Sequence, residues 1–135
     1  MEESGWRKKT VCIVDDDENV RDIYRAKFQK EGFVVILAQD GEAGVALIRA
    51  QQPDIILLDL QMPILDGFEV LRILKSDEHL TRIPVVIFSN VEDEAVFQKV
   101  EALGSAQYYL IKSLTDSQKV VDIVLKVLAE QTTGK

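Results

Sequence analysis

Residues 55–59 read Ile-Ile-Leu-Leu-Asp, a short apolar run that ends abruptly in a carboxylate. Three further runs have the same form: Val-Cys-Ile-Val-Asp-Asp-Asp at 11–17, Val-Val-Ile-Phe-Ser at 85–89 and Tyr-Tyr-Leu-Ile-Lys at 108–112. Their length and β-branched content predict strands of a parallel sheet. The carboxyl ends of parallel strands share one edge, so the polar residues that follow these runs are expected to converge there.

Helical patterns separate these runs. The first is an apolar stripe at helical spacing, formed by Val20, Ile23, Tyr24 and Phe28. Further helices are predicted at residues 41–51, through 70–74, through 96–103 and after 115, with a second strand at 33–38. Strand and helix therefore alternate five times. This alternation predicts an α/β fold, a doubly wound three-layer sandwich in which helices cover both faces of a five-stranded parallel sheet.

Polar residues mark the expected starts of several helices. Asp40 is expected to cap the helix at 41–51, and Ser89 or Asn90 the fourth helix. The last helix opens at Thr115-Asp116-Ser117-Gln118, which matches the capping-box pattern.

The composition limits the classes of protein to consider. The chain has 135 residues, 47% of them hydrophobic, so a single domain over 1–135 with its core at about 10–130 is expected. The formal net charge of −7 disfavours direct binding to nucleic acid. No apolar stretch approaches the roughly 20 residues that span a membrane, and no signal peptide is evident, so a cytoplasmic location without membrane attachment is expected. The single cysteine, Cys12, lies in an apolar run and is interpreted as a small buried side chain.

Asp15, Asp16 and Asp59 form the acidic part of the expected edge. Crowded carboxylates raise one another's pKa unless a cation lies among them, so the cluster predicts a divalent metal site. Oxygen ligands favour Mg²⁺. Helix capping could account for Asp15 and Asp16 alone. It does not account for Asp59, because an unpaired acid is unfavourable at a buried strand end.

In order and spacing, these residues resemble the receiver domain of two-component response regulators. The resemblance extends from residue 11 to about residue 128. It rests on Val14-Asp15-Asp16, Leu58-Asp59, Met62-Pro63 with Asp66-Gly67, Ser89, and Tyr109 three places before Lys112. It implies a CheY-like, flavodoxin-like (βα)5 fold with strand order 2-1-3-4-5.

The resemblance also implies how the site works. Asp59 is the expected phosphoacceptor, attacking the phosphorus of a phosphohistidine or a small acyl phosphate. Mg²⁺ would be held by Asp16, Asp59 and the backbone carbonyl of Gln61, and by Asp15 through a bound water. Mg²⁺ and Lys112 would stabilise the charge on the transferring group.

The implied switch involves Ser89 and Tyr109. Ser89 would bind the phosphoryl group and move toward it, leaving space into which the Tyr109 ring can turn. The fourth helix, fifth strand and fifth helix would then present a changed surface to a downstream protein target. The donor would be a sensor histidine kinase or a histidine phosphotransfer protein. Such a domain is not an enzyme, since it catalyses only its own phosphorylation and dephosphorylation. The sequence leaves open whether the protein forms a homodimer through the fourth and fifth helices.

The chain departs from the family pattern at two positions. Ser113 follows Lys112 where the family usually has proline in a cis peptide, and a cis bond before a non-proline residue costs about 3–4 kcal/mol. The family's geometry at this bond is therefore in question. Asn90 follows Ser89 where the family usually has alanine or glycine, and the larger amide is expected to narrow access to the phosphoryl group.

Three other functions make different demands on the sequence. An aspartate-nucleophile phosphatase would carry a second aspartate at the position of Gln61. A flavin carrier would need a phosphate cradle after the first strand, but three carboxylates stand there. The remaining alternative is a pseudo-receiver, in which the same fold serves as a constitutive protein-binding module and Asn90 and Ser113 mark lost switching.

Overall fold

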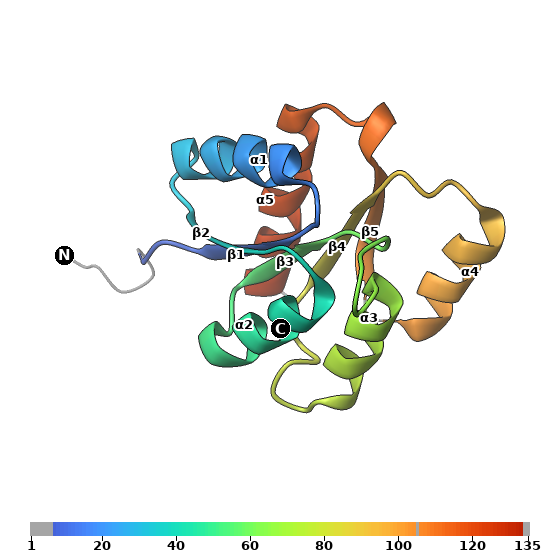
Figure 1. Ribbon diagram of the computed structural model, residues 1–135. Coiled ribbons are helices and arrows are strands. Elements are labelled where there is room, and N and C mark those ends of the chain that lie inside the picture. The colour runs from blue at the N-terminus through green and yellow to red at the C-terminus, as the bar shows by residue number, and fades with distance from the viewer. Residues whose placement is uncertain (1–6, 105, 134–135) are drawn as a thin grey trace.

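Five parallel strands form one sheet between two layers of helices (Figure 1). The computed structural model describes residues 7–104 and 106–133. The strands run in the spatial order β2-β1-β3-β4-β5, so the strand order implied by the resemblance is confirmed. Their bounds are β1 Thr10–Val14, β2 Val34–Ala38, β3 Ile55–Leu58, β4 Val85–Ser89 and β5 Ala106–Ile111.

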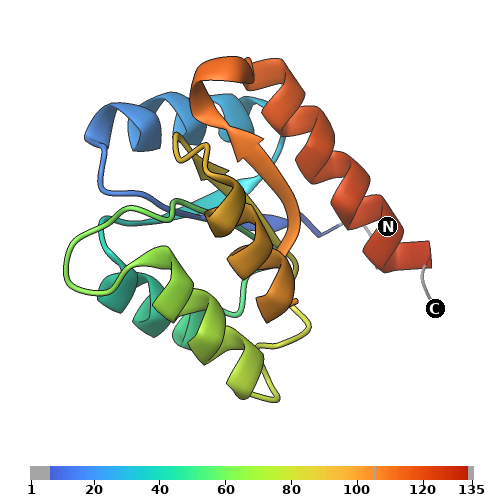
Figure 2. The ribbon, with the colours of Figure 1, turned by 90° about the vertical axis from the view of Figure 1, so that its right-hand side faces the viewer.

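The helices cover both faces of the sheet, with α1 and α5 on one side and α2, α3 and α4 on the other (Figures 1 and 2). Their bounds are α1 Glu18–Lys30, α2 Gly41–Gln51, α3 Gly67–Ser76, α4 Glu94–Leu103 and α5 Ser117–Thr133, with a 3-10 turn at Lys112–Leu114. The predicted α/β sandwich is therefore confirmed. Within the described ranges, none of the helices has the length and apolar character needed to cross a membrane.

The central strands divide their side chains between two cores. In β1, Val11 and Ile13 pack with residues of α1 and α5, whereas Cys12 and Val14 pack with residues of α2 and α3. β3 alternates in the same way. Strands buried on both faces need apolar residues at every position, which explains the unbroken hydrophobic runs of the sequence.

The start of α4 differs from the expectation. Asp93 caps this helix, because its side chain accepts a hydrogen bond from the Ala95 N–H at 2.8 Å. Ser89 and Asn90 lie too early in the chain to do so: β4 ends at Ser89, and a loop follows before the first turn of α4. The cap at Asp40 is confirmed, since its side chain accepts from the Ala43 N–H at 2.7 Å.

Two other details were predicted wrongly. The cap of α5 is Asp116 rather than Thr115, because the Asp116 carboxylate accepts from the Lys119 N–H at 2.8 Å. The apolar stripe at residues 20–28 predicts that Ile23 packs against the core, yet its side chain is 57% exposed. The buried face of α1 is centred on Tyr24 and Phe28, and Ile23 lies at its margin.

Candidate functional site

Three carboxylates meet at the carboxyl edge of the two neighbouring strands β1 and β3. Asp15 and Asp16 follow β1 and Asp59 follows β3, and each of the three offers an oxygen within 4.8 Å of the others. The register pairs Val14 with Leu58, so Asp15 and Asp59 leave the sheet side by side. Asp15 is 2% and Asp59 6% exposed, whereas Asp16 faces solvent. The expected convergence of these residues is therefore present.

Lys112 reaches this cluster from the end of β5. Its Nζ lies 2.8 Å from Asp15 Oδ2 and 3.3 Å from Asp59 Oδ2, and its side chain is 15% exposed. Burial lowers the pKa of the Lys112 ammonium, but the hydrogen bond and charge of Asp15 and the charge of Asp59 outweigh burial, so its pKa is raised. Lys112 is therefore held in its charged form, in contact with both buried acids.

One ammonium does not balance three carboxylates. Burial raises the pKa of Asp15, and the charge of Asp59 adds to this, despite the hydrogen bond from Lys112. The site thus has a surplus of negative charge, an all-oxygen donor set and one ligand, Asp16, open to solvent. These properties fit a hydrated Mg²⁺ ion. Among the residues described, no other group of three acidic, histidine or cysteine side chains has ligand atoms so close together.

The third aspartate of the loop has a structural role. Asp17 caps α1, its side chain accepting from the Asn19 N–H at 2.9 Å, and its own N–H donates to Asp15 Oδ1 at 2.9 Å. Helix capping therefore explains Asp17 and leaves Asp15 and Asp16 available. Arg21, which the sequence analysis did not single out, donates from Nη1 to the backbone carbonyl of Asp15 at 2.8 Å. The sequence offered one signal for this contact: Arg21 is a basic residue about one turn into the helix that follows the acidic residues.

The loop after β3 contacts the Asp59 side chain through its backbone. The N–H of Gln61 donates to Asp59 Oδ1 at 3.3 Å, and Gln61 itself is exposed beside the cluster. The N–H of Gly67, the first residue of α3, donates to the Leu60 carbonyl at 3.0 Å. A Cβ at Gly67 would lie 2.5 Å from the Asp59 carbonyl oxygen and 2.6 Å from Leu60 Cα. The glycine thus permits α3 to pack directly against the backbone that carries Asp59.

Ser89 and Tyr109 are linked through one loop residue, Val91. The Ser89 hydroxyl, fully buried at the end of β4, accepts from the Val91 N–H at 3.4 Å. The Tyr109 hydroxyl donates to the Val91 carbonyl at 2.8 Å, and its ring meets the Phe97 ring of α4 edge-on at 4.7 Å. Burial, followed by the charges of Asp59 and Asp93, raises the pKa of Tyr109. The β4–α4 loop therefore connects the two residues of the expected switch.

The two departures from the family pattern contact each other. The backbone N–H of Ser113 donates to Asn90 Oδ1 at 2.9 Å. The peptide bonds of the described residues are all trans, that between Lys112 and Ser113 included. Lys112 nevertheless reaches Asp15 and Asp59. The steric effect of Asn90 on phosphodonors stays a prediction.

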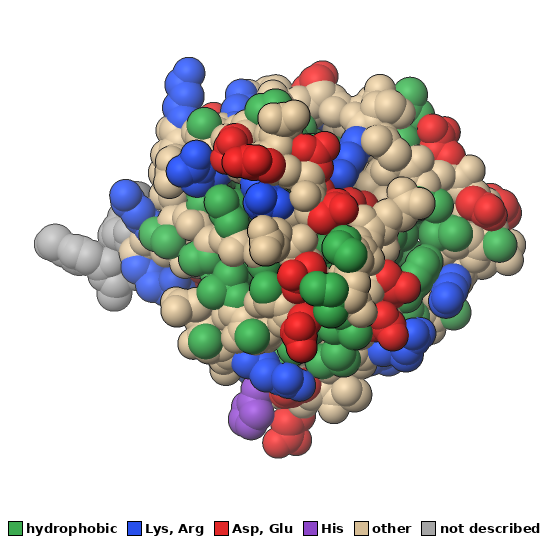
Figure 3. Space-filling model, viewed as in Figure 1, with side chains coloured by type: hydrophobic (Ala, Val, Ile, Leu, Met, Phe, Trp, Pro, Cys, Tyr) green, Lys and Arg blue, Asp and Glu red, His purple; other side chains and the backbone are tan. Residues whose placement is uncertain are grey.

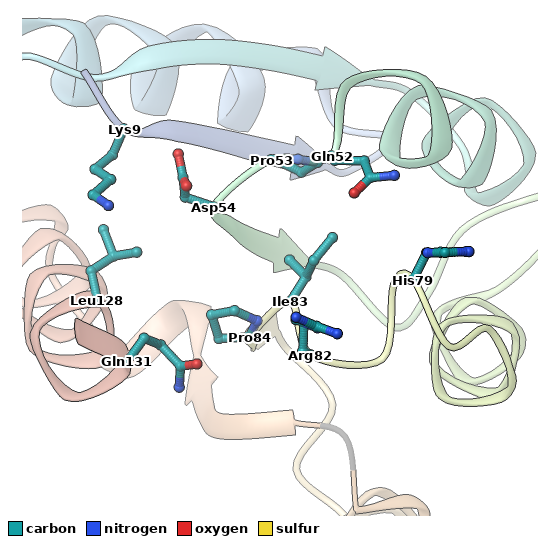
Figure 4. Close-up of a pocket in the computed structure, with 10 residues that line it drawn as sticks. All are labelled: Lys9, Gln52, Pro53, Asp54, His79, Arg82, Ile83, Pro84, Leu128 and Gln131. Atoms are coloured by element: carbon teal, nitrogen blue, oxygen red, sulfur yellow. The ribbon is translucent and has the colours of Figure 1, made fainter. Parts of the chain in front are cut away.

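A hollow of about 340 Å³ lies at the opposite edge of the sheet (Figure 4). Lys9, Asp54, Arg82 and Gln131 are among the residues that line it. Burial raises the pKa of Asp54, but hydrogen bonds from the Arg7 side chain and the Thr10 N–H outweigh it and lower that pKa. Asp54 is therefore engaged in holding the amino-terminal segment to the sheet.

Comparisons with known proteins give the family. Residues 11–125 match the family model of the response regulator receiver domain. Protein PilH of Pseudomonas aeruginosa is 35% identical over 121 residues, which cover 88% of this chain and 97% of PilH. Response regulator PleD of Caulobacter vibrioides is 39% identical over 108 residues, which cover 78% of this chain and 23% of PleD. The chain thus spans nearly all of one relative and less than a quarter of the other.

Solved structures give the same fold. A CheY-like receiver domain protein from Methanospirillum hungatei superposes with a TM-score of 0.87 at 21% identity, covering 96% of this chain and 100% of that chain. The receiver domain of the Francisella response regulator 1452 gives a TM-score of 0.80 at 26% identity, covering 93% and 100%. With the family model and PilH, these likenesses lead to one conclusion: the chain belongs to the response regulator receiver domain family.

Proposed function

We propose that this receiver accepts a phosphoryl group on Asp59, in the presence of Mg²⁺, from the phosphohistidine of a sensor histidine kinase or a histidine phosphotransfer protein. The observation that carries the proposal is the contact of Lys112 Nζ with both Asp15 Oδ2 and Asp59 Oδ2, at 2.8 and 3.3 Å. A cation shared by two buried carboxylates neutralises charge at the point where an incoming phosphoryl group would add more.

The transfer is a displacement at phosphorus. A carboxylate oxygen of Asp59 forms the new P–O bond while the P–N bond to the donor imidazole breaks, and the imidazole leaves with the electron pair of that bond. Lys112 would pair with the phosphoryl oxygens, and the Ser89 hydroxyl would donate a hydrogen bond to them. Asp15, Asp16, Asp59 and the Gln61 carbonyl would hold Mg²⁺, which when bound supplies positive charge to the transferring group.

The switch follows from the shared contacts at Val91. If Ser89 turns to the phosphoryl group, its bond to the Val91 N–H is lost, and the Val91 carbonyl that holds the Tyr109 hydroxyl is free to shift. The Tyr109 ring would then leave its present position beside Phe97, changing the surface of α4, β5 and α5. That surface would be read by a downstream protein target.

The wider role proposed is that of a signalling domain, not an enzyme with a separate substrate. We place it in the cytoplasm, as one receiver unit that acts by protein contact. Direct binding to nucleic acid is not part of the proposal, because the net charge is −7 and basic side chains are interspersed with acidic ones on the face shown in Figure 3.

Acetyl phosphate with Mg²⁺, followed by intact-mass measurement, tests the proposal. The wild-type protein should gain one acid-labile phosphoryl group, and the Asp59→Asn variant none. Asp17→Asn is the matched control, since it removes a neighbouring carboxylate that caps α1 and should still be labelled. A wild-type protein that remains unlabelled by acetyl phosphate and by a panel of phosphorylated histidine kinases would overturn the proposal and favour the pseudo-receiver.

A further inference from the structure

A single hydrogen bond ties the β4–α4 loop to the turn after β5. It runs from the Ser113 N–H to Asn90 Oδ1 over 2.9 Å. Each partner directly follows a residue of the candidate site, Asn90 after Ser89 and Ser113 after Lys112. We propose that Asn90 is a positioning residue for Lys112, which it acts on through the backbone of Ser113. This inference rests on the proposed function and assigns one more residue to it.

The sheet register explains why these two residues meet. β4 and β5 are parallel neighbours in which Ser89 pairs with Ile111, so the chain beyond Ser89 runs beside the turn that begins at Lys112. The first N–H groups of a helical turn have no acceptor within that turn. The Asn90 side chain accepts the hydrogen bond from the Ser113 N–H. Ile111, the residue before the turn, makes no capping hydrogen bond with its side chain.

The geometry of Lys112 depends on this turn. Lys112 is its first residue. From the end of β5, the Lys112 side chain must extend past the end of β4 to reach Asp59, which follows β3, and Asp15, which follows β1. A turn held only at its ends leaves the direction of the lysine side chain less well defined. The Asn90 bond holds the residue next to Lys112 and so keeps the ammonium between the two carboxylates.

The hydrogen bond between Asn90 and Ser113 also relates the two departures from the family pattern to each other, although they lie far apart in the sequence. A proline at 113 has no N–H to donate, and an alanine or glycine at 90 has no side-chain acceptor. The bond exists only because this chain carries asparagine at one position and a non-proline residue at the other. The trans Lys112–Ser113 peptide is thereby compatible with a lysine that reaches the site.

Matched substitutions separate the hydrogen bond from the bulk of the amide. Ser113→Pro removes the donor, whereas Ser113→Ala keeps the N–H and is the control. Asn90→Leu removes the acceptor and keeps the number and branching of the side-chain heavy atoms, which Asn90→Ala would not. Asn90 and Ser113 are both exposed, so Asn90→Leu is expected to fold even if Ser113→Pro does not.

Two measurements are made on each variant. In the unphosphorylated protein, the NMR shifts of the Lys112 Cε and Nζ atoms report the contact of the ammonium with the carboxylates. We expect them to move in Asn90→Leu and Ser113→Pro but not in Ser113→Ala. In the presence of Mg²⁺, the rate of labelling by acetyl phosphate should fall about three- to tenfold in the first two variants, the range that one hydrogen bond provides. The double variant should be no slower than either single one.

Unchanged Lys112 shifts and labelling rates in Asn90→Leu would overturn the inference. So would fully additive losses in the double variant, because independent effects do not share one bond. Should the wild type itself fail to be labelled, the proposed function falls, whereas the NMR comparison still decides whether Asn90 positions Lys112.

Discussion

Replacing Gly67 by alanine should damage the fold and the acceptor together. The added methyl carbon would lie 2.5 Å from the Asp59 carbonyl oxygen, about 0.9 Å inside the 3.4 Å at which ordinary contact begins. It would also lie 2.6 Å from Leu60 Cα. Both obstacles are backbone atoms, so no side-chain rotation relieves them. The first turn of α3 and the segment after β3 must move apart.

Two terms set the size of the effect. Overpacking of this kind costs about 1–3 kcal/mol. Alanine gains up to about 1 kcal/mol over glycine in a helix interior, and less at the first helical position, where Gly67 lies. The free energy of unfolding should therefore fall by about 2 kcal/mol. A shift approaching 1 Å at a reacting group can lower a rate about 100-fold, so labelling of Asp59 should fall far more than stability alone would explain.

Urea denaturation followed by circular dichroism measures the first effect, and acetyl phosphate labelling the second. Gly32→Ala is the control: Gly32 has a φ of +94° with no atom within 4 Å of a built Cβ, so alanine there costs stability through backbone strain. It lies at the opposite edge of the sheet and should leave labelling unchanged. Equal labelling rates in the Gly67→Ala variant and the wild type would refute the steric reasoning.

Three further predictions concern stability and reactivity. Asp66→Ala breaks the capping box in which Asp66 Oδ1 accepts from the Glu69 N–H at 3.0 Å, and thermal denaturation should show a loss of about 1 kcal/mol. Burial raises the pKa of Cys12 to about 12, so iodoacetamide at pH 8 should modify this thiol only after unfolding, as read by mass spectrometry. The lowered pKa of Asp54 means that its stabilisation is present above the unfolded-state value of about 3.9 and is lost as the pH falls through the folded-state value. Asp54→Asn should therefore cost about 1 kcal/mol at pH 7 and less at pH 2; an equal difference in the free energy of unfolding, measured by urea denaturation at both pH values, would contradict this.

Most of the architecture could be predicted because it depends on local patterns. An unbroken run such as residues 55–58 indicates a strand buried on both faces, and a carboxylate at its end indicates a site. The errors arose where contacts with another segment of the chain determine which residues are buried. Ile23 fits the apolar spacing of α1, but only the packing of Tyr24 against Phe88, with ring centroids 5.1 Å apart, shows where the buried face is centred.

The contacts of the site were less predictable than its residues. The acidic residues and Lys112 could be singled out from their places after apolar runs, but the strand order came from the family resemblance. The bond between Asn90 and Ser113 joins residues 23 positions apart, and no periodicity relates them. It exists because β4 and β5 are neighbours in the register observed, which only the folded sheet defines.

The place of β5 in the sheet has a mechanical consequence. β5 pairs with β4 alone, whereas β1 and β3 each have a partner on both sides. The two buried acids, Asp15 and Asp59, therefore follow interior strands, whereas Lys112, which contacts both of them, follows the edge strand β5. If β5 separated locally from β4, the Lys112 ammonium would move away from the site while Asp15 and Asp59 kept their positions. Exchange of amide hydrogens with deuterium should accordingly be faster along β5 than along β1 or β3.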